Sequence, residues 1–246
     1  MKQVQRVLLA AVLVLTCFVV YQQKTEMVTM NECITGAYHN RQIISEDIDS
    51  IYGILSEKLD LSVLESCGII TNGYGHGSCV AIGSDLILTA GHCIGIPDAW
   101  VEIGGVKYEI TEEWASNEYD IGFAKIEGNV PYVVLGEIPE LLDEAYLVGS
   151  PYDVDFIKSI TKGIISHLAR DIRDWEALIQ TDAEAAPGSS GGPLFNESGQ
   201  VVGICVTGAN PGGGVTLCEP VSHIKEALAE YQKKKVVDVA EEARRY

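Results

Sequence analysis

From Gly68 onward the chain consists of short apolar runs separated by glycine, proline and polar residues. Such runs predict strands joined by tight turns, and many short strands without long helical periods indicate an all-β domain built as a barrel. The predicted strands are Ser78–Ile82, Leu86–Leu88, Val101–Ile103, Ile121–Ile126, Ala145–Val148, Ser159–Ser166, Leu178–Gln180, Val201–Val206 and Gly214–Cys218.

The N-terminus has a different pattern. Residues 7–21 are uncharged and mostly apolar, and they follow a short stretch that contains Lys2 and Arg6. A basic segment followed by about 15 apolar residues is typical of an export signal. We expect residues 1–21 to be either a cleaved signal peptide or an uncleaved signal-anchor, which would place residues 7–21 in the membrane and the rest of the chain outside the cytoplasm.

Between this segment and the strands lies a second region without strand pattern. Residues 22–44 are polar, and apolar residues recur with helical spacing between Ser45 and Glu65. We therefore expect a stalk and a short helical pre-segment over residues 22–66. The helix either packs on the folded domain or mediates self-association.

Composition narrows the class of protein. The chain has 246 residues, of which 47% are hydrophobic and 21% are charged, and its formal net charge is −18. The apolar content excludes a disordered chain. The acidic balance argues against nucleic acid, because binding the phosphate backbone needs clustered Lys and Arg. It favours solubility or basic partners.

Three segments carry candidate chemistry. Residues 187–194 read Pro-Gly-Ser-Ser-Gly-Gly-Pro-Leu, a glycine-rich turn that presents Ser190. The apolar run 86–90 is followed by His92, and Asp120 directly precedes the alternating run 121–126. A serine hydroxyl needs a neighbouring base to become nucleophilic, and the base needs a carboxylate to orient it. The order His, Asp, Ser is one known solution to this geometry.

These motifs resemble those of trypsin/chymotrypsin-like serine proteases, and most closely the HtrA (DegP-like) branch. Residues 180–183, Gln-Thr-Asp-Ala, resemble the segment that precedes the nucleophile in that branch. Residues 161–166 resemble its Gly-Ile-Val-Ser strand, and residues 201–204 fit the strand after the nucleophile. The resemblance covers roughly residues 67–230.

The resemblance implies a chymotrypsin-like fold of two six-stranded antiparallel β-barrels with the active site between them. It assigns residues 67–231 to the protease domain, which ends in a C-terminal helix over residues 221–231. Residues 232–246 are then a charged, frayed tail. On this assignment we expect no PDZ domain within residues 1–246, although fuller HtrA proteins carry one.

The resemblance also implies a mechanism. Ser190 is the expected nucleophile, His92 the general base, and Asp120 the residue that orients the imidazole. The backbone N–H groups of Gly188 and Ser190 would form the oxyanion hole. This chemistry needs no cofactor, and no Cys-x-x-Cys or paired-His spacing predicts a metal site.

In an exported chain, the six cysteines after residue 17 suggest disulfides. Cys79 and Cys93 match the bridge that many trypsin-like proteases place beside the catalytic histidine. Cys205 and Cys218 flank a glycine-rich turn, and they either form a cross-strand bridge or stay free and buried. The pair Cys33 and Cys67 is what remains.

Substrate specificity is less defined. Val206, Thr207 and Gly208 should border the S1 pocket. Glu184 lies six residues before Ser190, the offset of the S1-floor acid in trypsin, and a carboxylate there would favour Lys or Arg at P1. The HtrA-like segment instead implies small or medium aliphatic P1 residues, with Glu184 in solvent. The remaining histidines, at positions 39, 76, 167 and 223, are expected on the surface.

The sequence therefore predicts a serine endopeptidase that hydrolyses polypeptides through an acyl-enzyme. It would be secreted, periplasmic or membrane-anchored, and its oligomeric state is open. One alternative is a non-catalytic binding or chaperone-like module on a protease scaffold. Another is a precursor that is activated by removal of the residues before about Gly68.

Overall fold

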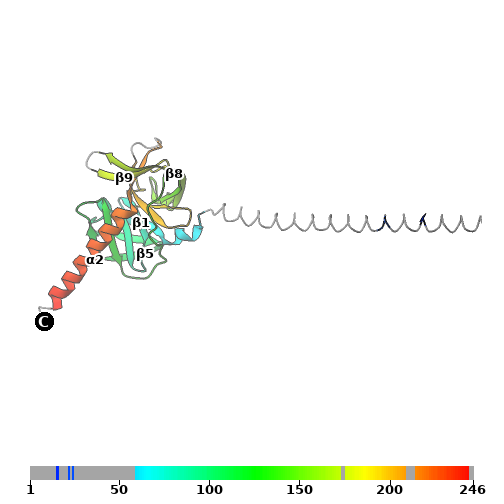
Figure 1. Ribbon diagram of the computed structural model, residues 1–246. Helices are drawn as coiled ribbons and strands as arrows, with labels where there is room; N and C mark the ends of the chain where they lie inside the picture. Colours follow the sequence, from blue (N-terminus) through cyan, green and yellow to red (C-terminus); the bar gives the residue numbers. More distant parts are fainter. Residues whose placement is uncertain are drawn as a thin grey trace, which may run out of the picture. The chain divides into compact units, whose positions relative to one another are not determined.

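The computed structural model describes residues 59–172, 175–208 and 214–243, together with Leu15, Thr16, Gln22 and Lys24 (Figure 1). The chain divides into two units, Met1–Glu57 and Lys58–Tyr246. The expected signal or anchor helix and most of the pre-segment lie outside the described residues. Within the described part of the chain, no helix has the length and apolar composition that a membrane span requires.

Six antiparallel strands form a first closed barrel in the order β1-β2-β3-β6-β5-β4. Their side chains alternate between the barrel interior and the outside, as the period of a strand requires. The strands are β1 Cys67–Thr71, β2 His76–Ala81, β3 Leu86–Ala90, β4 Trp100–Ile103, β5 Val106–Ala115 and β6 Ile121–Ile126.

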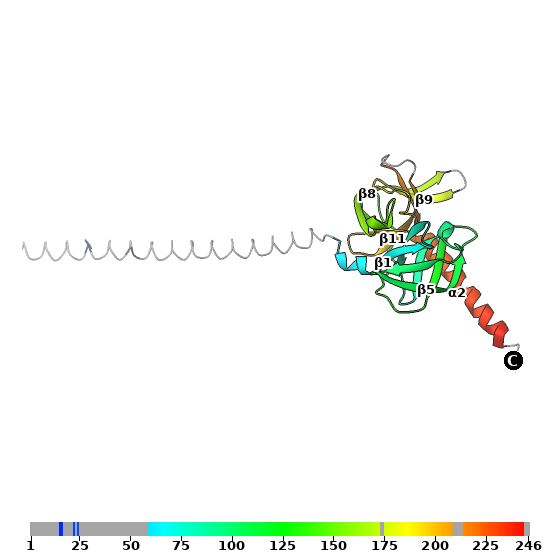
Figure 2. The same cartoon turned by 180° about the vertical axis from the view of Figure 1, so that it is seen from behind.

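A second closed barrel follows in the order β10-β11-β12-β9-β8-β7 (Figure 2). Two barrels of six antiparallel strands confirm the predicted chymotrypsin-like architecture. The strands are β7 Glu144–Gly149, β8 Ser159–Ile172, β9 Trp175–Thr181, β10 Pro193–Phe195, β11 Val201–Gly208 and β12 Thr216–Pro220.

One hydrophobic cluster joins the two barrels and the C-terminal helix α2, Val221–Ala243. Phe123 of the first barrel and Phe195 of the second are both fully buried in it. Tyr231 of α2 packs on Phe123 with ring centroids 5.5 Å apart. Burying a side chain of this size contributes about 1.5–3 kcal/mol, so the cluster fixes the two barrels and the helix as one body.

The segment before β1 also packs on this body. Its described part is a 3₁₀ helix, η1 Leu61–Ser66, whose first N–H groups are capped by Asp60. Leu59 and Val63 are buried in the same hydrophobic cluster. Of the two alternatives for the pre-segment, packing on the folded domain is confirmed for these residues.

At the other end of the chain, the helix is longer than expected. Residues 232–246 were expected to be a frayed tail, but α2 continues to Ala243. Alanine, glutamate, lysine and glutamine have high helix propensity and are frequent in this stretch. Lys235 also forms an ion pair with Glu112 of β5 at 2.6 Å.

The predicted disulfide between Cys79 and Cys93 is wrong, because both cysteines are free and buried. The reason is the register of β2. A Cβ atom on Gly77 would lie 2.5 Å from Cys93 Sγ, so Gly77 is the residue opposite Cys93. Cys79 points to the same face of the strand as Gly77, but it lies two residues further along β2 and is therefore not opposite Cys93.

The cysteines of the other predicted pairs that the structure describes are not bonded either. Cys205 and Cys218 are direct partners across β11 and β12, yet both are free, as is Cys67. Cys33 lies outside the described residues. Burial raises the pKa of Cys79 well above its usual range, as it raises the pKa of Cys67 to about 12. These thiols are therefore structural and unreactive.

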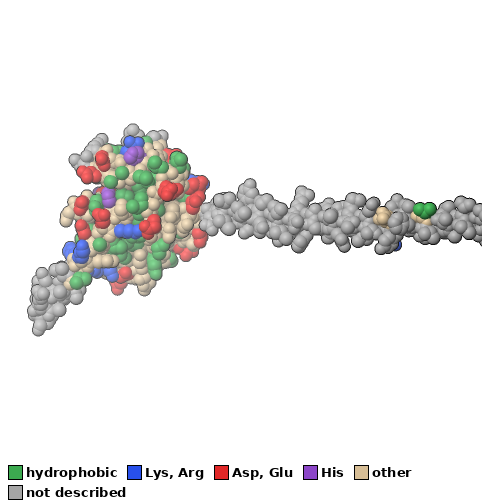
Figure 3. Space-filling model, viewed as in Figure 1, with side chains coloured by type: hydrophobic (Ala, Val, Ile, Leu, Met, Phe, Trp, Pro, Cys, Tyr) green, Lys and Arg blue, Asp and Glu red, His purple; other side chains and the backbone are tan. Residues whose placement is uncertain are grey.

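Acidic side chains are spread over the visible face of the protease body, in keeping with the negative net charge (Figure 3). The visible face shows no continuous basic surface.

Candidate active site

His92 and Asp120 are neighbours because of strand register. His92 lies in the short 3₁₀ turn η2, Gly91–Cys93, directly after β3, and Asp120 directly precedes β6. β3 and β6 are paired, with Ala90 opposite Ile121. The end of one strand and the start of the other therefore place the two candidate residues side by side.

Two hydrogen bonds join this pair. The imidazole Nδ1 of His92 donates to Asp120 Oδ2 at 2.7 Å, and the His92 backbone N–H donates to Asp120 Oδ1 at 2.8 Å. The His92 side chain is half exposed, whereas that of Asp120 is largely buried. With Nδ1–H bound to the carboxylate, Nε2 is the nitrogen left to accept a proton.

The carboxylate also changes the acid–base behaviour of the imidazole. Its hydrogen bond is the largest cause that raises the pKa of His92 above the ordinary value of 6.5, and the neighbouring Cys93 acts in the same direction. A negative charge beside the ring favours the imidazolium form.

Ser190 is presented by the turn between β9 and β10, and both barrels fix its position. The Ser78 N–H of the first barrel donates to the Ser190 carbonyl at 2.7 Å. The Gly191 N–H donates to the Cys205 carbonyl of the second barrel at 2.7 Å. Gly191 has φ +82°, and a Cβ there would lie 2.2 Å from Thr89 Oγ1. Only glycine allows this conformation and this approach.

The Ser190 hydroxyl itself points to the second barrel, where it donates to the Val206 carbonyl at 3.5 Å. The described hydrogen bonds include none between Ser190 and His92. Cys93, next to His92 in sequence, reaches the Ser190 carbonyl with its Sγ at 3.9 Å. In unliganded sites the bond between nucleophile and base is often long, and it tightens when substrate binds.

The residues before Ser190 form a type II turn. The Ser189 N–H donates to the Ala186 carbonyl at 2.9 Å, which closes a four-residue turn, and Gly188 at its third position has φ +97°. Proline at the second position and glycine with positive φ at the third are the residues that a type II turn prefers.

The peptide between Pro187 and Gly188 is held through its carbonyl, which accepts a hydrogen bond from the Tyr152 N–H at 2.6 Å. Because a trans peptide is planar, its C=O and N–H point in opposite directions. Within the described residues, neither the Gly188 N–H nor the Ser190 N–H is used in a hydrogen bond. Both donors are therefore available to an oxyanion.

Ser189, the residue between them, faces inward. It is only 3% exposed, and its hydroxyl accepts a hydrogen bond from the Ala186 N–H at 3.4 Å. It therefore acts as a packed spacer in the turn.

A cavity of about 180 Å³ opens beside Ser190. It lies next to Ser190, between the turn and β11, where the S1 pocket was expected. The predicted pocket residues Val206 and Thr207 line it, and Gly208 pairs with Thr216 at the end of β11. The lining residues are Ala185, Ala186, Pro187, Ser190, Cys205, Val206 and Thr207.

Glu184 is not among these lining residues. Ala183 and Ala185 are buried, and Glu184 between them is exposed, as the alternation of an extended segment requires. Of the two roles considered for Glu184, this placement favours the solvent-exposed one. The described wall of the cavity is made of small and apolar side chains without a carboxylate.

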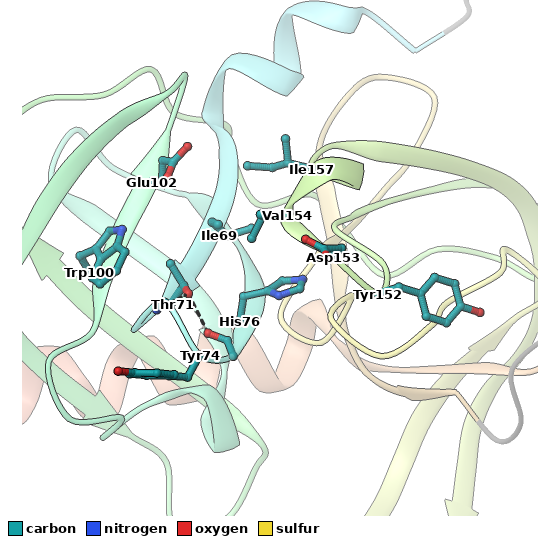
Figure 4. A pocket seen from close by; sticks show the side chains of 12 residues that line it. Ile69, Thr71, Tyr74, His76, Trp100, Glu102, Tyr152, Asp153, Val154 and Ile157 are labelled. Atoms are coloured by element: carbon teal, nitrogen blue, oxygen red, sulfur yellow. Dashed lines mark hydrogen bonds between the residues drawn. The ribbon is translucent and has the colours of Figure 1, made fainter.

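A larger cavity of about 460 Å³ lies between the first barrel and the segment that follows β7 (Figure 4). It is bounded by β1, β2 and β4 of the first barrel and by residues 152–157 of the second. His76, expected on the surface, forms part of its wall. The His76 Nε2 lies 2.7 Å from the Ser150 carbonyl, and a Cβ on Gly188 would lie 2.6 Å from the same nitrogen.

Sequence analysis missed several residues that support the site. The Ser78 hydroxyl donates to the Gly188 carbonyl at 2.8 Å and accepts from the Ser150 N–H at 2.9 Å. Glu219 accepts from the Asp120 N–H, and His223, expected on the surface, contacts Glu219. Apart from Glu219 and His223, which are four residues apart, these partners lie at least 72 residues apart in sequence, and no local motif marks them.

Among the described residues, no His, Cys, Asp and Glu side chains gather in a group of three or more that could hold a metal ion.

Comparison with known proteins agrees with this geometry. The trypsin-like peptidase domain family matches residues 77–204, which is more than half of the chain, and the chain belongs to this family. Relatives that match it with more than 30% identity include proteins with DegP-like names.

Two of these relatives show how far the similarity extends. A probable periplasmic serine endoprotease DegP-like of Pseudomonas putida (strain GB-1) is 36% identical over 136 residues, which cover 52% of this chain and 28% of that protein. Serine protease HTR4 of Bos taurus is 32% identical over 152 residues, covering 58% and 31%. The chain thus spans less than a third of the length of these two relatives.

Solved structures share the fold. The serine endoprotease from Yersinia pestis aligns with a TM-score of 0.59 and 23% identity, covering 68% of this chain and 63% of that chain. An inactive form of Rv3671c from M. tuberculosis H37Rv aligns with a TM-score of 0.61 and 19% identity, covering 69% and 87%.

Proposed function

We propose that this chain is a serine endopeptidase that uses Ser190, His92 and Asp120 as a catalytic triad. The observation that carries the proposal is the doubly hydrogen-bonded pair of His92 and Asp120, which lies beside a turn with Ser190 and two unused N–H donors. Membership of the trypsin-like peptidase family gives independent support.

In the proposed acylation step, Ser190 Oγ attacks the scissile carbonyl carbon while its proton passes to His92 Nε2. Asp120 stabilises the imidazolium that results. The carbonyl oxygen becomes an oxyanion and accepts hydrogen bonds from the N–H groups of Gly188 and Ser190. The intermediate collapses, the C–N bond breaks, and His92 gives its proton to the leaving amine.

Deacylation repeats the same steps with water as the nucleophile. His92 takes a proton from water as it attacks the acyl carbon, and the proton then returns to Ser190 Oγ as the ester bond breaks. The cycle leaves the enzyme unchanged and needs no cofactor.

The site also suggests the kind of substrate and its location. The S1 cavity of about 180 Å³ and its small, apolar wall favour small or medium aliphatic P1 side chains. The basic and apolar N-terminus and the periplasmic names of relatives support export, with the catalytic domain outside the cytoplasm.

The test is hydrolysis of an unfolded protein such as casein by the purified full chain. Ser190→Ala and His92→Ala should each abolish hydrolysis, since losing either residue lowers kcat by on the order of 10⁶ in a related triad. Matched controls are Ser198→Ala in an exposed turn and His167→Ala in β8, which should retain activity. Equal hydrolysis by Ser190→Ala and the unmodified chain would refute the proposal.

A further inference from the structure

Glu219 is a buried carboxylate with a defined pair of partners. It lies near the end of β12, is only 2% exposed, and directly precedes the proline that leads into α2. A charge in such a place is costly unless both of its oxygens are hydrogen-bonded. An apolar side chain of similar size would fill the same space at lower cost, so packing alone does not explain the choice of glutamate.

Each oxygen of Glu219 has one partner. Oε1 accepts from the backbone N–H of Asp120 at 3.0 Å, and Oε2 lies 2.7 Å from His223 Nδ1, one helical turn further along the chain. The partner of Oε1 belongs to the residue whose own carboxylate orients His92. A chain of hydrogen bonds therefore runs from α2 through Glu219 to the candidate triad.

His223 is itself fixed by the segment that carries Asp120. Its ring stacks on Tyr119 with centroids 4.1 Å apart and an interplanar angle of 16°. The Tyr119 hydroxyl donates to Glu226 Oε2 at 2.6 Å, also on α2. Tyr119 and Asp120 are thus attached to β12 and α2 at two adjacent points.

We infer that Glu219, oriented by His223, is a positioning residue that sets the orientation of Asp120 toward His92. The inference rests on the proposed function, because it assigns Glu219 a role in the same triad. Glu219 touches neither substrate nor reacting atoms, and it acts through the Asp120 backbone. A displacement of about 1 Å in a catalytic group can lower the rate about 100-fold. Loss of the hydrogen bond between Glu219 and the Asp120 N–H should therefore lower the rate measurably if it lets Asp120 move.

A pH profile of kcat/KM distinguishes a positioning role of Glu219 from a role in stabilising the fold alone. The groups that face Glu219 are His223 and Asp120, with Tyr119 and its partner Glu226 beside them. If Asp120 loses its anchor, its hydrogen bond to His92 weakens. Because that bond raises the pKa of His92, the acid limb of kcat/KM should then move to lower pH.

The experiment compares Glu219→Leu, Glu219→Gln and His223→Phe in the full chain, with the concentration of active sites titrated by a fluorophosphonate. We expect Glu219→Leu to lower kcat per titrated site about tenfold to 100-fold, with KM within about twofold and an acid-shifted profile. Glu219→Gln keeps an acceptor for the Asp120 N–H and should restore most of kcat. Glu230→Gln, exposed on the same helix, is the matched control.

The outcomes are distinguishable. If the unmodified chain is labelled and hydrolyses peptide, but Glu219→Leu keeps its kcat and pH profile, the role of Glu219 is refuted and the proposed function stands. If the unmodified chain is neither labelled nor active, the proposed function itself fails. If Glu219→Leu does not fold, His223→Phe decides: it keeps the stacking with Tyr119, and an unchanged kcat and profile would overturn the inference.

Discussion

Asp120 accepts two hydrogen bonds from His92, one from the imidazole Nδ1 at 2.7 Å and one from the backbone N–H at 2.8 Å. The second bond fixes the carboxylate relative to the chain, so the first is made to an oriented acceptor. The tautomer and the direction of the ring are then both determined before substrate arrives.

This pairing predicts the pH dependence of hydrolysis. Because the Asp120 carboxylate raises the pKa of His92 above 6.5, the imidazole stays protonated to higher pH and becomes a general base only above that pKa. We expect kcat/KM of the full chain to rise with pH through an apparent pKa above 6.5. A profile whose acid limb has its midpoint at or below 6.5 would contradict this role of Asp120.

The oxyanion turn makes a second prediction. Gly188 has φ +97°, and a Cβ there would lie 2.4 Å from the Ser150 carbonyl oxygen and 2.6 Å from His76 Nε2. Gly188→Ala should therefore distort the turn and remove one oxyanion donor, lowering kcat by about 10²–10³.

The matched control for this variant is Gly75→Ala, because a Cβ at that position would meet nothing within 4 Å. Its kcat should remain near that of the unmodified chain. If kcat on the same peptide fell by a comparable factor in both variants, the loss in Gly188→Ala would not come from the turn.

The register of β2 makes a third prediction, about stability. A Cβ on Gly77 would lie 3.4 Å from the Cβ of Cys93, close to the range of about 3.5–4.5 Å found in disulfides. Gly77→Cys should therefore form the bridge that Cys79 does not form. Closing a loop of about 15 residues stabilises a protein by about 3 kcal/mol in the chain-entropy model, less any strain in the folded state.

The comparison is between oxidised Gly77→Cys and Gly77→Ser, which adds a similar side chain without a bond. Non-reducing mass analysis should show the loss of two thiols in the cysteine variant, and its Tm should exceed that of the serine variant. Thiols that remain free under oxidising conditions would mean that Gly77 is not opposite Cys93.

The fourth prediction concerns specificity. The small, apolar wall of the S1 cavity and the exposed position of Glu184 lead us to expect cleavage after small or medium aliphatic residues. Glu184→Ala should leave the cleavage profile of a peptide library unchanged. A preference for Lys or Arg at P1 that disappears in Glu184→Ala would assign the carboxylate to the pocket after all.

Local patterns predicted an all-β barrel fold and the three candidate catalytic residues, and the family resemblance supplied the two six-stranded barrels. Most strands are visible as apolar runs, and the residues around Ser190 form a continuous motif. β5 is an exception, because Lys107, Glu109, Glu112 and Glu113 interrupt its apolar positions. Its partly buried residues alternate with exposed polar ones, so its pattern is that of a strand with a polar outer face. The exposed residues of this alternation are Lys107, Glu109, Thr111 and Glu113, whereas Glu112 lies on the partly buried face.

The rest of the site depends on contacts between distant parts of the chain. Asp120 and Glu219 are 99 residues apart, and their hydrogen bond follows from the packing of β12 and α2 against the first barrel. The disulfide prediction failed for a related reason. The resemblance to trypsin-like proteases placed Cys79 opposite Cys93, but the alternation of side chains along β2 places Gly77 there instead.

The most direct measurement is the reaction of the folded full chain with a labelled fluorophosphonate, followed by peptide mapping. We expect a single covalent label on Ser190, lost in Ser190→Ala, strongly slowed in His92→Ala and retained in Ser198→Ala. Absence of labelling in folded protein, or a label on another serine, would contradict the assignment of Ser190 as the activated nucleophile.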